Sequence, residues 1–105
     1  MNTIPSSNYL ITQTESFNKW LTGLRDLQAR VAIARRIERM SVGNFGDTKP
    51  VGGGISELRI DIGPGYRVYY TQRERVLVIL LCGGDKRTQR LDIQRAQHLA
   101  KENKS

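Results

Sequence analysis

The first part of the chain carries apolar residues at helical spacing. After a short strand candidate at 9–12, Thr14 and Ser16 offer N-caps for a first helix. Four large apolar side chains repeat along one side of that helix, namely Phe17, Trp20, Leu21 and Leu24. A second helix is predicted from about Asp26 to Met40. Its broad apolar side consists of Leu27, Val31, Ala34, Ile37, Ile33 and Met40. We interpret both apolar sides as core.

Between residues 57 and 70 the pattern changes to an alternation of apolar and polar residues, which is typical of strands with one buried face. The inward set is Leu58, Ile60, Ile62, Val68 and Tyr70, and the outward set is Glu57, Arg59, Asp61, Arg67 and Tyr69. One face of this sheet is therefore expected to form core, while the other presents charge.

The segment Gly63-Pro64-Gly65 is predicted to join these strands as a three-residue loop. The resulting cross-strand pairs are Ile62 with Tyr66, Asp61 with Arg67, and Arg59 with Tyr69. Two arginines and a tyrosine would then share an open sheet face. Such a face suits a phosphodiester, since guanidinium groups bind phosphate oxygens and an aromatic ring stacks on a base. A solvated face with cross-strand ion pairs accounts for the same residues equally well.

The remaining segments complete the expected fold. The glycine-rich stretch 43–54 is predicted to be a loop, and the apolar run 76–82 a central strand that is covered on both sides. Gly83-Gly84 should let the chain leave the sheet in conformations closed to other residues. Thr88 is expected to cap a last helix through about residue 100, whose inward residues are Ile93, Ala96, Leu99 and Ala100.

Composition narrows the class of protein. The 105 residues allow one domain with a single modest core, and 17 Lys and Arg against 10 Asp and Glu give a net charge of +7. This charge favours a polyanionic or acidic partner. No cationic leader and no run of about 18 apolar residues is present, so we expect a cytoplasmic protein without a membrane span. Cys82 and His98, each the only residue of its type, leave neither a disulfide nor a zinc site. We therefore expect no metal and no cofactor.

Three ordered motifs then suggest a family. They are Gly54-Ile55-Ser56-Glu57-Leu58-Arg59-Ile60-Asp61, Gly63-Pro64-Gly65-Tyr66-Arg67-Val68-Tyr69, and Gly83-Gly84-Asp85-Lys86-Arg87-Thr88-Gln89 followed by Asp92-Ile93 and Ala96. With these motifs the chain resembles the RelE/ParE superfamily of type II toxin–antitoxin toxins, and most closely its HigB-like "addiction module killer protein" group. The resemblance spans nearly the whole chain. It implies an α+β, RelE-like fold, with an N-terminal strand and a helical hairpin packed on an antiparallel sheet and a C-terminal helix, in one domain at 1–105.

The resemblance also implies a function. Ribosome-dependent members of the superfamily cleave translated mRNA by activating the 2′-hydroxyl of the substrate against the adjacent phosphate. That chemistry needs a base, an acid and fixed positive charge, and no metal. Mapped by motif, the catalytic candidates are Arg59, Arg67 and Lys86. We assign RNA contacts to Tyr69, Arg87 and Arg90.

The chain departs from the best understood family pattern at the general base. The strand lysines that serve as base are absent, and Asp92-Ile93 stands near the place of the C-terminal tyrosine. The candidates, in order of preference, are Lys86, Glu57, Tyr69 and His98.

The resemblance implies protein and RNA partners as well. These are a cognate antitoxin, expected to be a helix-turn-helix, HigA-like protein through which the complex would bind DNA, and the ribosome with its mRNA. Two other functions compete with cleavage. One is a non-catalytic, ParE-like poison of DNA gyrase, for which the missing base is no defect, and the other is a purely antitoxin-binding module.

Overall fold

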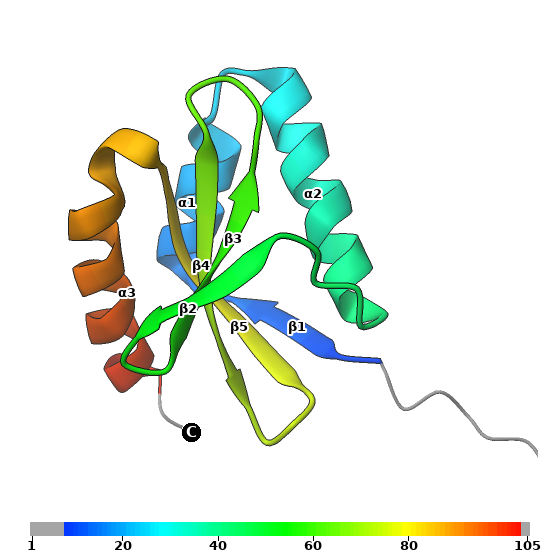
Figure 1. Ribbon diagram of the computed structural model, residues 1–105, viewed down its shortest axis with the longest axis vertical. Coiled ribbons are helices and arrows are strands. Elements are labelled where there is room, and N and C mark those ends of the chain that lie inside the picture. The colour runs from blue at the N-terminus through cyan, green and yellow to red at the C-terminus, as the bar shows by residue number, and fades with distance from the viewer. Residues whose placement is uncertain (1–7, 104–105) are drawn as a thin grey trace, which may run out of the picture.

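The computed structural model of the protein describes residues 8–103, which form a five-stranded sheet and three α-helices (Figure 1). In chain order the elements are β1 (Leu10–Gln13), α1 (Glu15–Gly23), α2 (Leu27–Ser41), β2 (Thr48–Gly52), β3 (Ile55–Ile60), β4 (Tyr66–Arg73), β5 (Leu77–Asp85), the 3-10 helix η1 (Lys86–Thr88) and α3 (Gln89–Glu102). This confirms the mixed α+β class with an N-terminal strand, a helical hairpin and a C-terminal helix. The predicted domain also includes residues 1–7 and 104–105, which lie outside the described residues.

The strand order is β1-β5-β4-β3-β2, and β1 runs parallel to β5. The expected antiparallel pairing holds for β2 to β5, but the N-terminal strand joins the sheet in the parallel direction, so the sheet is mixed rather than antiparallel. A parallel pair needs a long crossover connection, and here both helices and three strands separate β1 from β5 in sequence. Thr14 fixes the end of β1 to β5, because its hydroxyl donates to the Leu81 carbonyl at 2.6 Å. The same side chain accepts from Phe17 N at 3.0 Å and so caps α1, as predicted.

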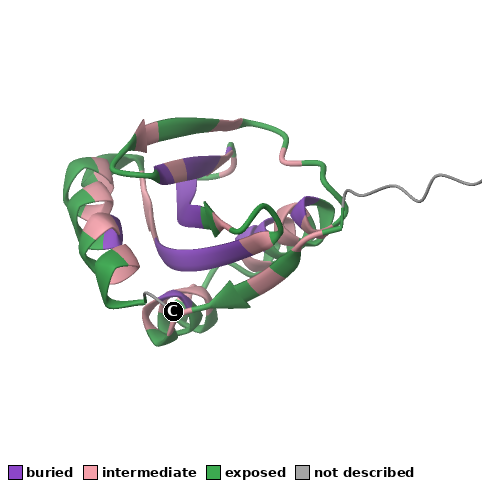
Figure 2. Cartoon of the chain, turned by 90° about the horizontal axis from the view of Figure 1, so that it is seen from below, coloured by how far each residue is buried: buried purple, intermediate pink, exposed green. Residues whose placement is uncertain are grey.

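Helices cover both faces of the sheet, so the expected single core is two clusters of buried residues. Helices α1 and α2 lie on one face and α3 on the other, with the buried strands between them (Figures 1 and 2). The first cluster includes Phe17, Ile33, Leu58, Val68, Val78 and Leu80, and the second consists of Ile55, Tyr69, Ile79, Leu81, Cys82 and Ala96. From Val78 to Leu81, successive residues of β5 belong to opposite clusters, which confirms the prediction of a strand covered on both sides. Among residues 8–103, no helix combines the length and apolarity that a bilayer crossing requires.

The β3–β4 hairpin has a longer loop than predicted. Arg59 pairs with Arg67 and Glu57 with Tyr69, so the register differs by two residues from the expected one. The chain leaves the ladder after Ile60 and turns through residues 61–65, where Gly63 and Gly65 have φ values of 55° and 84°. A shift of two residues keeps every side chain on its predicted face, so the inward and outward sets of β3 and β4 stay as expected.

Part of the predicted loop at 43–54 is a strand. β2 pairs with β3 in the antiparallel direction, with Thr48 opposite Leu58 and Pro50 opposite Ser56. The glycines do not prevent this, because Gly52 ends β2 opposite Ile55, and Gly53 and Gly54, both with positive φ, form the turn into β3. Pro50 is tolerated because β2 lies at the edge of the sheet.

Gly83 and Gly84 stay within β5 rather than ending the sheet, and neither has a positive φ. Their role is close approach. A Cβ at Gly83 would overlap the indole ring of Trp20 on α1, and one at Gly84 would overlap the carboxylate of Asp92 on α3. Helices on both faces therefore press against the end of β5, and only glycine leaves room for them.

Helix α2 is less covered than its apolar pattern predicts. Ala29, Ile33 and Met40 are buried, but Leu27 is 66% and Val31 45% exposed. The three buried residues, Ala29, Ile33 and Met40, are spaced at i, i+4 and i+11, so this side of the helix faces the sheet. The result is an apolar side of α2 that its own fold leaves in solvent.

Candidate functional site

Two predicted site residues, Arg67 and Tyr69, lie beneath α3 rather than on an open face. Tyr69 and its cross-strand neighbour Glu57 are both 0% exposed, and Arg67 is 8% exposed. The predicted solvent-facing sheet surface is therefore wrong. Ala96 of α3 is itself 0% exposed and presents only a methyl group to the sheet, so the helix can lie close against these strands. The alternation of polar residues marks a buried polar layer instead.

Glu57 is the centre of this layer. Gln89 Nε2 donates to Glu57 Oε1 at 2.7 Å. Arg67 Nε lies 3.9 Å from the same oxygen, and Arg59 Nη1 lies 4.0 Å from Oε2. A buried carboxylate persists where opposite charge and hydrogen-bond donors offset its desolvation. Glu57 is thus the counter-charge about which the two arginines are arranged.

The layer has more polar atoms than internal partners. Glu57 Oε2, Arg67 Nε and Tyr69 OH are buried and make no hydrogen bond to residues 8–103. Most buried polar atoms in native proteins are paired, so three such atoms together mark this place as a candidate site. Burial, and next the negative charge of Glu57, raises the pKa of the Tyr69 phenol well above its ordinary value. Tyr69 therefore keeps its proton, which argues against its role as a base.

Gly65 brings Arg67 and Lys86 together. A Cβ built on Gly65 would lie 3.5 Å from Arg67 Nη1 and 3.6 Å from Lys86 Cβ, so both side chains contact the glycine. Arg67 Nη1 also donates to the Tyr66 carbonyl at 3.1 Å, which fixes the guanidinium at the end of β4. The guanidinium of Arg67 and the aliphatic stem of Lys86, two of the three predicted catalytic residues, therefore lie beside the same glycine at the hairpin loop.

A hollow beside this point is lined by Lys86, Arg87, Gln89, Arg90 and Ile93. Lys86, Arg87 and Arg90 are exposed there, while Gln89 extends from the hollow to the buried carboxylate of Glu57. The hollow is thus a cationic surface connected with the buried polar layer.

The turn that carries this surface is fixed by its first residue, Asp85. Its carboxylate accepts from Arg87 N at 2.8 Å and from Arg87 Nη2 at 3.0 Å. The hydrogen bond from the Arg87 side chain is the main cause that lowers the pKa of Asp85. Asp85 therefore caps η1. Thr88 occupies the N-cap position of α3, as predicted, but its side chain makes no capping hydrogen bond there. Thr88 instead donates to Asp92 Oδ2 at 2.5 Å.

Arg59, the third predicted catalytic cation, lies opposite Arg67 in the ladder and has a side chain that is 37% exposed. Its Nη2 is 3.3 Å from Asp47 Oδ1. Its charge is therefore shared between Asp47 and Glu57, and a phosphate at this position would compete with both carboxylates.

The other candidate residues are either buried or distant from the site. Tyr69 is too deeply buried to stack on a base in this conformation. His98 has a 72% exposed side chain, and its Nε2 lies 3.3 Å from Glu102 Oε2, which confirms its prediction as a surface residue. Cys82 is 3% exposed, and burial raises the pKa of its thiol to about 12, which agrees with its prediction as a buried hydrophobe. Among residues 8–103, no group of three His, Cys, Asp or Glu side chains could hold a metal ion.

Gln89 is the site residue to which the sequence analysis gave no role. It ends the third motif and was available as a signal, but its partner Glu57 lies 32 positions earlier in the chain. Only the packing of α3 on β3 shows the pair.

Comparisons with known proteins give a family and a relative. Residues 19–104 match the profile of the family described as "Phage derived protein Gp49-like (DUF891)". The chain is also 55% identical over 92 residues to an uncharacterized protein of Haemophilus influenzae, a match that covers 88% of this chain and 93% of the relative.

Proposed function

Because the chain belongs to the Gp49-like family, which is associated with addiction-module killer proteins, we propose that it is the toxin of a toxin–antitoxin module and cleaves ribosome-bound mRNA. This proposal joins the family assignment to the RelE/ParE resemblance of the three motifs. A cognate antitoxin, the ribosome and its mRNA would be the partners, and the cytoplasm the place of action.

The observation that supports cleavage best is that Arg67 Nη1 and the stem of Lys86 lie beside the same glycine, Gly65, and that Lys86 lines a hollow with two further arginines. Phosphate oxygens are bound well by guanidinium and ammonium groups that are held in place before the substrate arrives. Arg67 is held by the Tyr66 carbonyl and by Glu57, so it loses little side-chain entropy on binding. The exposed arginines of the hollow would contact flanking phosphates of the RNA.

In the proposed reaction the 2′-oxygen of the RNA attacks the adjacent phosphorus and the bond to the 5′-oxygen breaks. The products are a 2′,3′-cyclic phosphate and a 5′-hydroxyl end. Arg67 stabilises the charge that develops on the phosphorane oxygens. Of the base candidates at this site, Glu57 and Tyr69 are buried and Lys86 is exposed, so we assign the 2′-hydroxyl proton to Lys86, while the departing 5′-oxygen takes a proton from water. Glu57 keeps Arg67 in position and does not touch the substrate.

The experiment that tests this function compares two targets. Purified protein is incubated with programmed ribosomes, and the mRNA ends are mapped, beside a DNA gyrase supercoiling assay. We expect cleavage of ribosome-bound mRNA, poor cleavage of free mRNA and unchanged supercoiling. If the mRNA stays intact and supercoiling is inhibited, the nuclease hypothesis is rejected in favour of the gyrase-poison hypothesis.

A further inference from the structure

The exposed side of α2 carries an apolar ridge. Leu27, Val31 and Ala34 follow one another at i, i+4 and i+7, so they lie on one face of the helix, and all three are exposed. Leu27 is 66% and Val31 45% exposed. Solitary apolar residues are common on protein surfaces, but a ridge of this kind forms a continuous patch.

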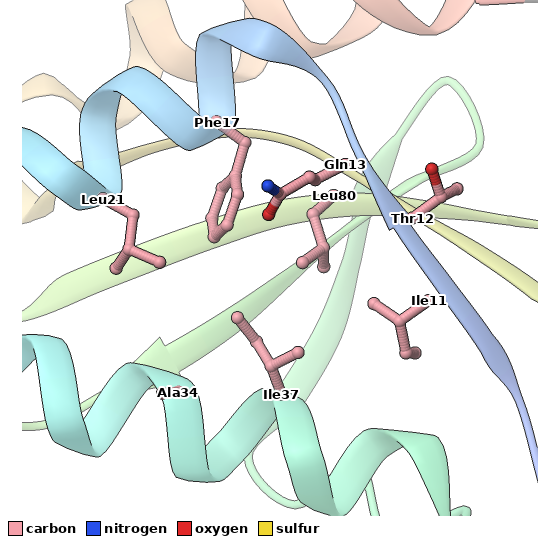
Figure 3. A pocket seen from close by; sticks show the side chains of 8 residues that line it. All are labelled: Ile11, Thr12, Gln13, Phe17, Leu21, Ala34, Ile37 and Leu80. Carbon is pink, nitrogen blue, oxygen red and sulfur yellow. The ribbon is translucent and has the colours of Figure 1, made fainter.

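Apolar hollows continue this ridge on both sides. Toward α1, one hollow includes Leu21, Leu27, Val31 and Ala34. It shares Leu21 and Ala34 with a neighbouring hollow of about 350 Å³ between α1, α2 and strands β1 and β5, into which Phe17, Ile37 and Leu80 point (Figure 3). On the other side of the ridge, Ile62 of the hairpin loop faces Leu27 and Val31 across a third hollow. The surface is therefore a groove and ridge that follow α2.

The charges around this surface are positive. The segment 25–41 contains the arginines Arg25, Arg30, Arg35, Arg36 and Arg39 and only two acidic residues, Asp26 and Glu38. The Asp26 carboxylate is already the N-cap of α2 and accepts from Ala29 N at 3.1 Å. Arg30 and Arg35 line the hollows themselves. A partner with acidic residues beside its apolar ones would therefore be complementary.

These features distinguish between the occupants. A second copy of this chain would place arginines against arginines, which like-charge repulsion disfavours. RNA would contact the arginines but would gain nothing from Leu27 and Val31 in solvent. An amphipathic helix with an acidic rim fits both the apolar ridge and the charges.

We propose that α2 and the α1–α2 groove dock an acidic amphipathic helix of the antitoxin, a proposal that rests on the proposed function. Because α2 has 15 residues, the partner helix would be roughly as long, about 22 Å. The groove lies on the sheet face opposite α3, whereas Gln89 and the cationic hollow belong to the α3 side. The antitoxin would thus leave Lys86 free and block ribosome entry by its bulk.

The test uses the purified antitoxin encoded beside this gene as the probe. Leu27→Asp/Val31→Asp puts two carboxylates on the ridge, and we expect the Kd for the antitoxin to rise by about 100-fold. The matched control is Leu91→Asp/Val76→Asp, whose positions are 68% and 48% exposed on α3 and on the β4–β5 turn. Its Kd should stay within about three-fold of the wild type. Thermal unfolding checks both variants, and Leu27→Gln/Val31→Gln replaces the first if it fails to fold.

An unchanged Kd in the folded Leu27/Val31 variant would overturn the proposal. Antitoxin binding that protects the amides of β1 from hydrogen exchange, but not those of α2, would also overturn it, because it would indicate strand addition. A third contrary result would be that ribosomal RNA binds to this face and that the ridge variant abolishes this binding. Growth arrest is measured separately. We expect the ridge variant to arrest growth and to escape rescue by the antitoxin. Failure of the wild type to cleave mRNA would reject the proposed function, while the Kd comparison would still decide the docking surface.

Discussion

Gly84→Ala tests how the end of β5 positions the candidate site. The added Cβ would overlap the Asp92 carboxylate and lie 2.9 Å from the Thr88 hydroxyl, so α3 and η1 must move or the side chains must rearrange. Overpacking of this kind costs about 1–3 kcal/mol. Loss of the Thr88–Asp92 hydrogen bond adds about 0.5–1.5 kcal/mol. We therefore expect the free energy of unfolding to fall by about 2–4 kcal/mol, and the Tm by at least about 8 °C.

The assay is urea and thermal unfolding, with two comparisons. Gly23→Ala is the matched control, because no heavy atom of residues 8–103 would lie within 4 Å of its Cβ and it ends α1 without a positive φ. This change should stabilise by about 0.4–1 kcal/mol. Removing the obstacle in Gly84→Ala/Asp92→Ala should restore at least about 1 kcal/mol relative to additivity. If Gly84→Ala unfolds within about 0.5 kcal/mol of the wild type, the close approach of α3 to β5 is refuted.

Further predictions concern the site and the core. Arg67→Ala should lower single-turnover cleavage by about 10²–10³-fold at saturating ribosomes, and Arg39→Ala, on the exposed side of α2, should leave it unchanged. Lys86→Arg keeps the positive charge but removes a group that can accept a proton, because arginine stays protonated. If Lys86 is the base, this variant should not cleave, and a cleavage rate near that of the wild type would exclude that role. Tyr69→Phe removes a buried hydroxyl that has no partner among residues 8–103, so stability should stay equal or rise with cleavage retained, and a folded, inactive variant would make Tyr69 catalytic. Cys82 should resist alkylation in the native protein, and its thiol should lower stability from about pH 9 upward, because the unfolded chain releases this proton near 9.0 and the folded chain near 12. Urea melts of the wild type and Cys82→Ala between pH 8 and 10 would contradict this if their slopes with pH were equal.

Arg36 shows why a surface pattern alone was insufficient. It lies among the five arginines of the segment 25–41, a pattern typical of a solvated helix face, but its Nη1 donates to the Arg59 carbonyl at 2.6 Å and its Nη2 to the Phe45 carbonyl at 3.3 Å. Arg36 thus fastens the chain before β2 to β3, and its replacement would disturb Arg59. Arg39 is the cleaner control for that reason.

Local periodicity in the sequence predicted those features of the fold that depend on residues close together in the chain. The faces of β3 and β4 and the doubly covered β5 follow from alternation and from an uninterrupted apolar run, Thr14 caps α1 as expected, and α2 begins near Asp26 as expected. Hairpin register depended on where Ile60 leaves the ladder, which the glycine pattern did not fix. The strand at Thr48–Gly52 was hidden because its pairing with β3 is a tertiary contact.

The sequence could not predict how the candidate site residues are placed. Polar alternation cannot distinguish a solvated sheet face from a polar layer under a helix, and the packing of Ala96 decides between them. Arg67 and Lys86 were named from the motifs, but Gly65 brings them together only in the fold. The Glu57–Gln89 hydrogen bond joins residues that are distant in sequence, and no local pattern contains it.

The central claim is that the protein cleaves RNA by activating the 2′-hydroxyl of the RNA itself. One modified substrate can test it. Programmed ribosomes carry an mRNA with a single 2′-deoxy nucleotide at the mapped cleavage site, beside the unmodified mRNA. We expect the unmodified mRNA to yield a 2′,3′-cyclic phosphate and a 5′-hydroxyl end, and the deoxy mRNA to stay intact at that bond. Equal cleavage of both mRNAs would contradict the account.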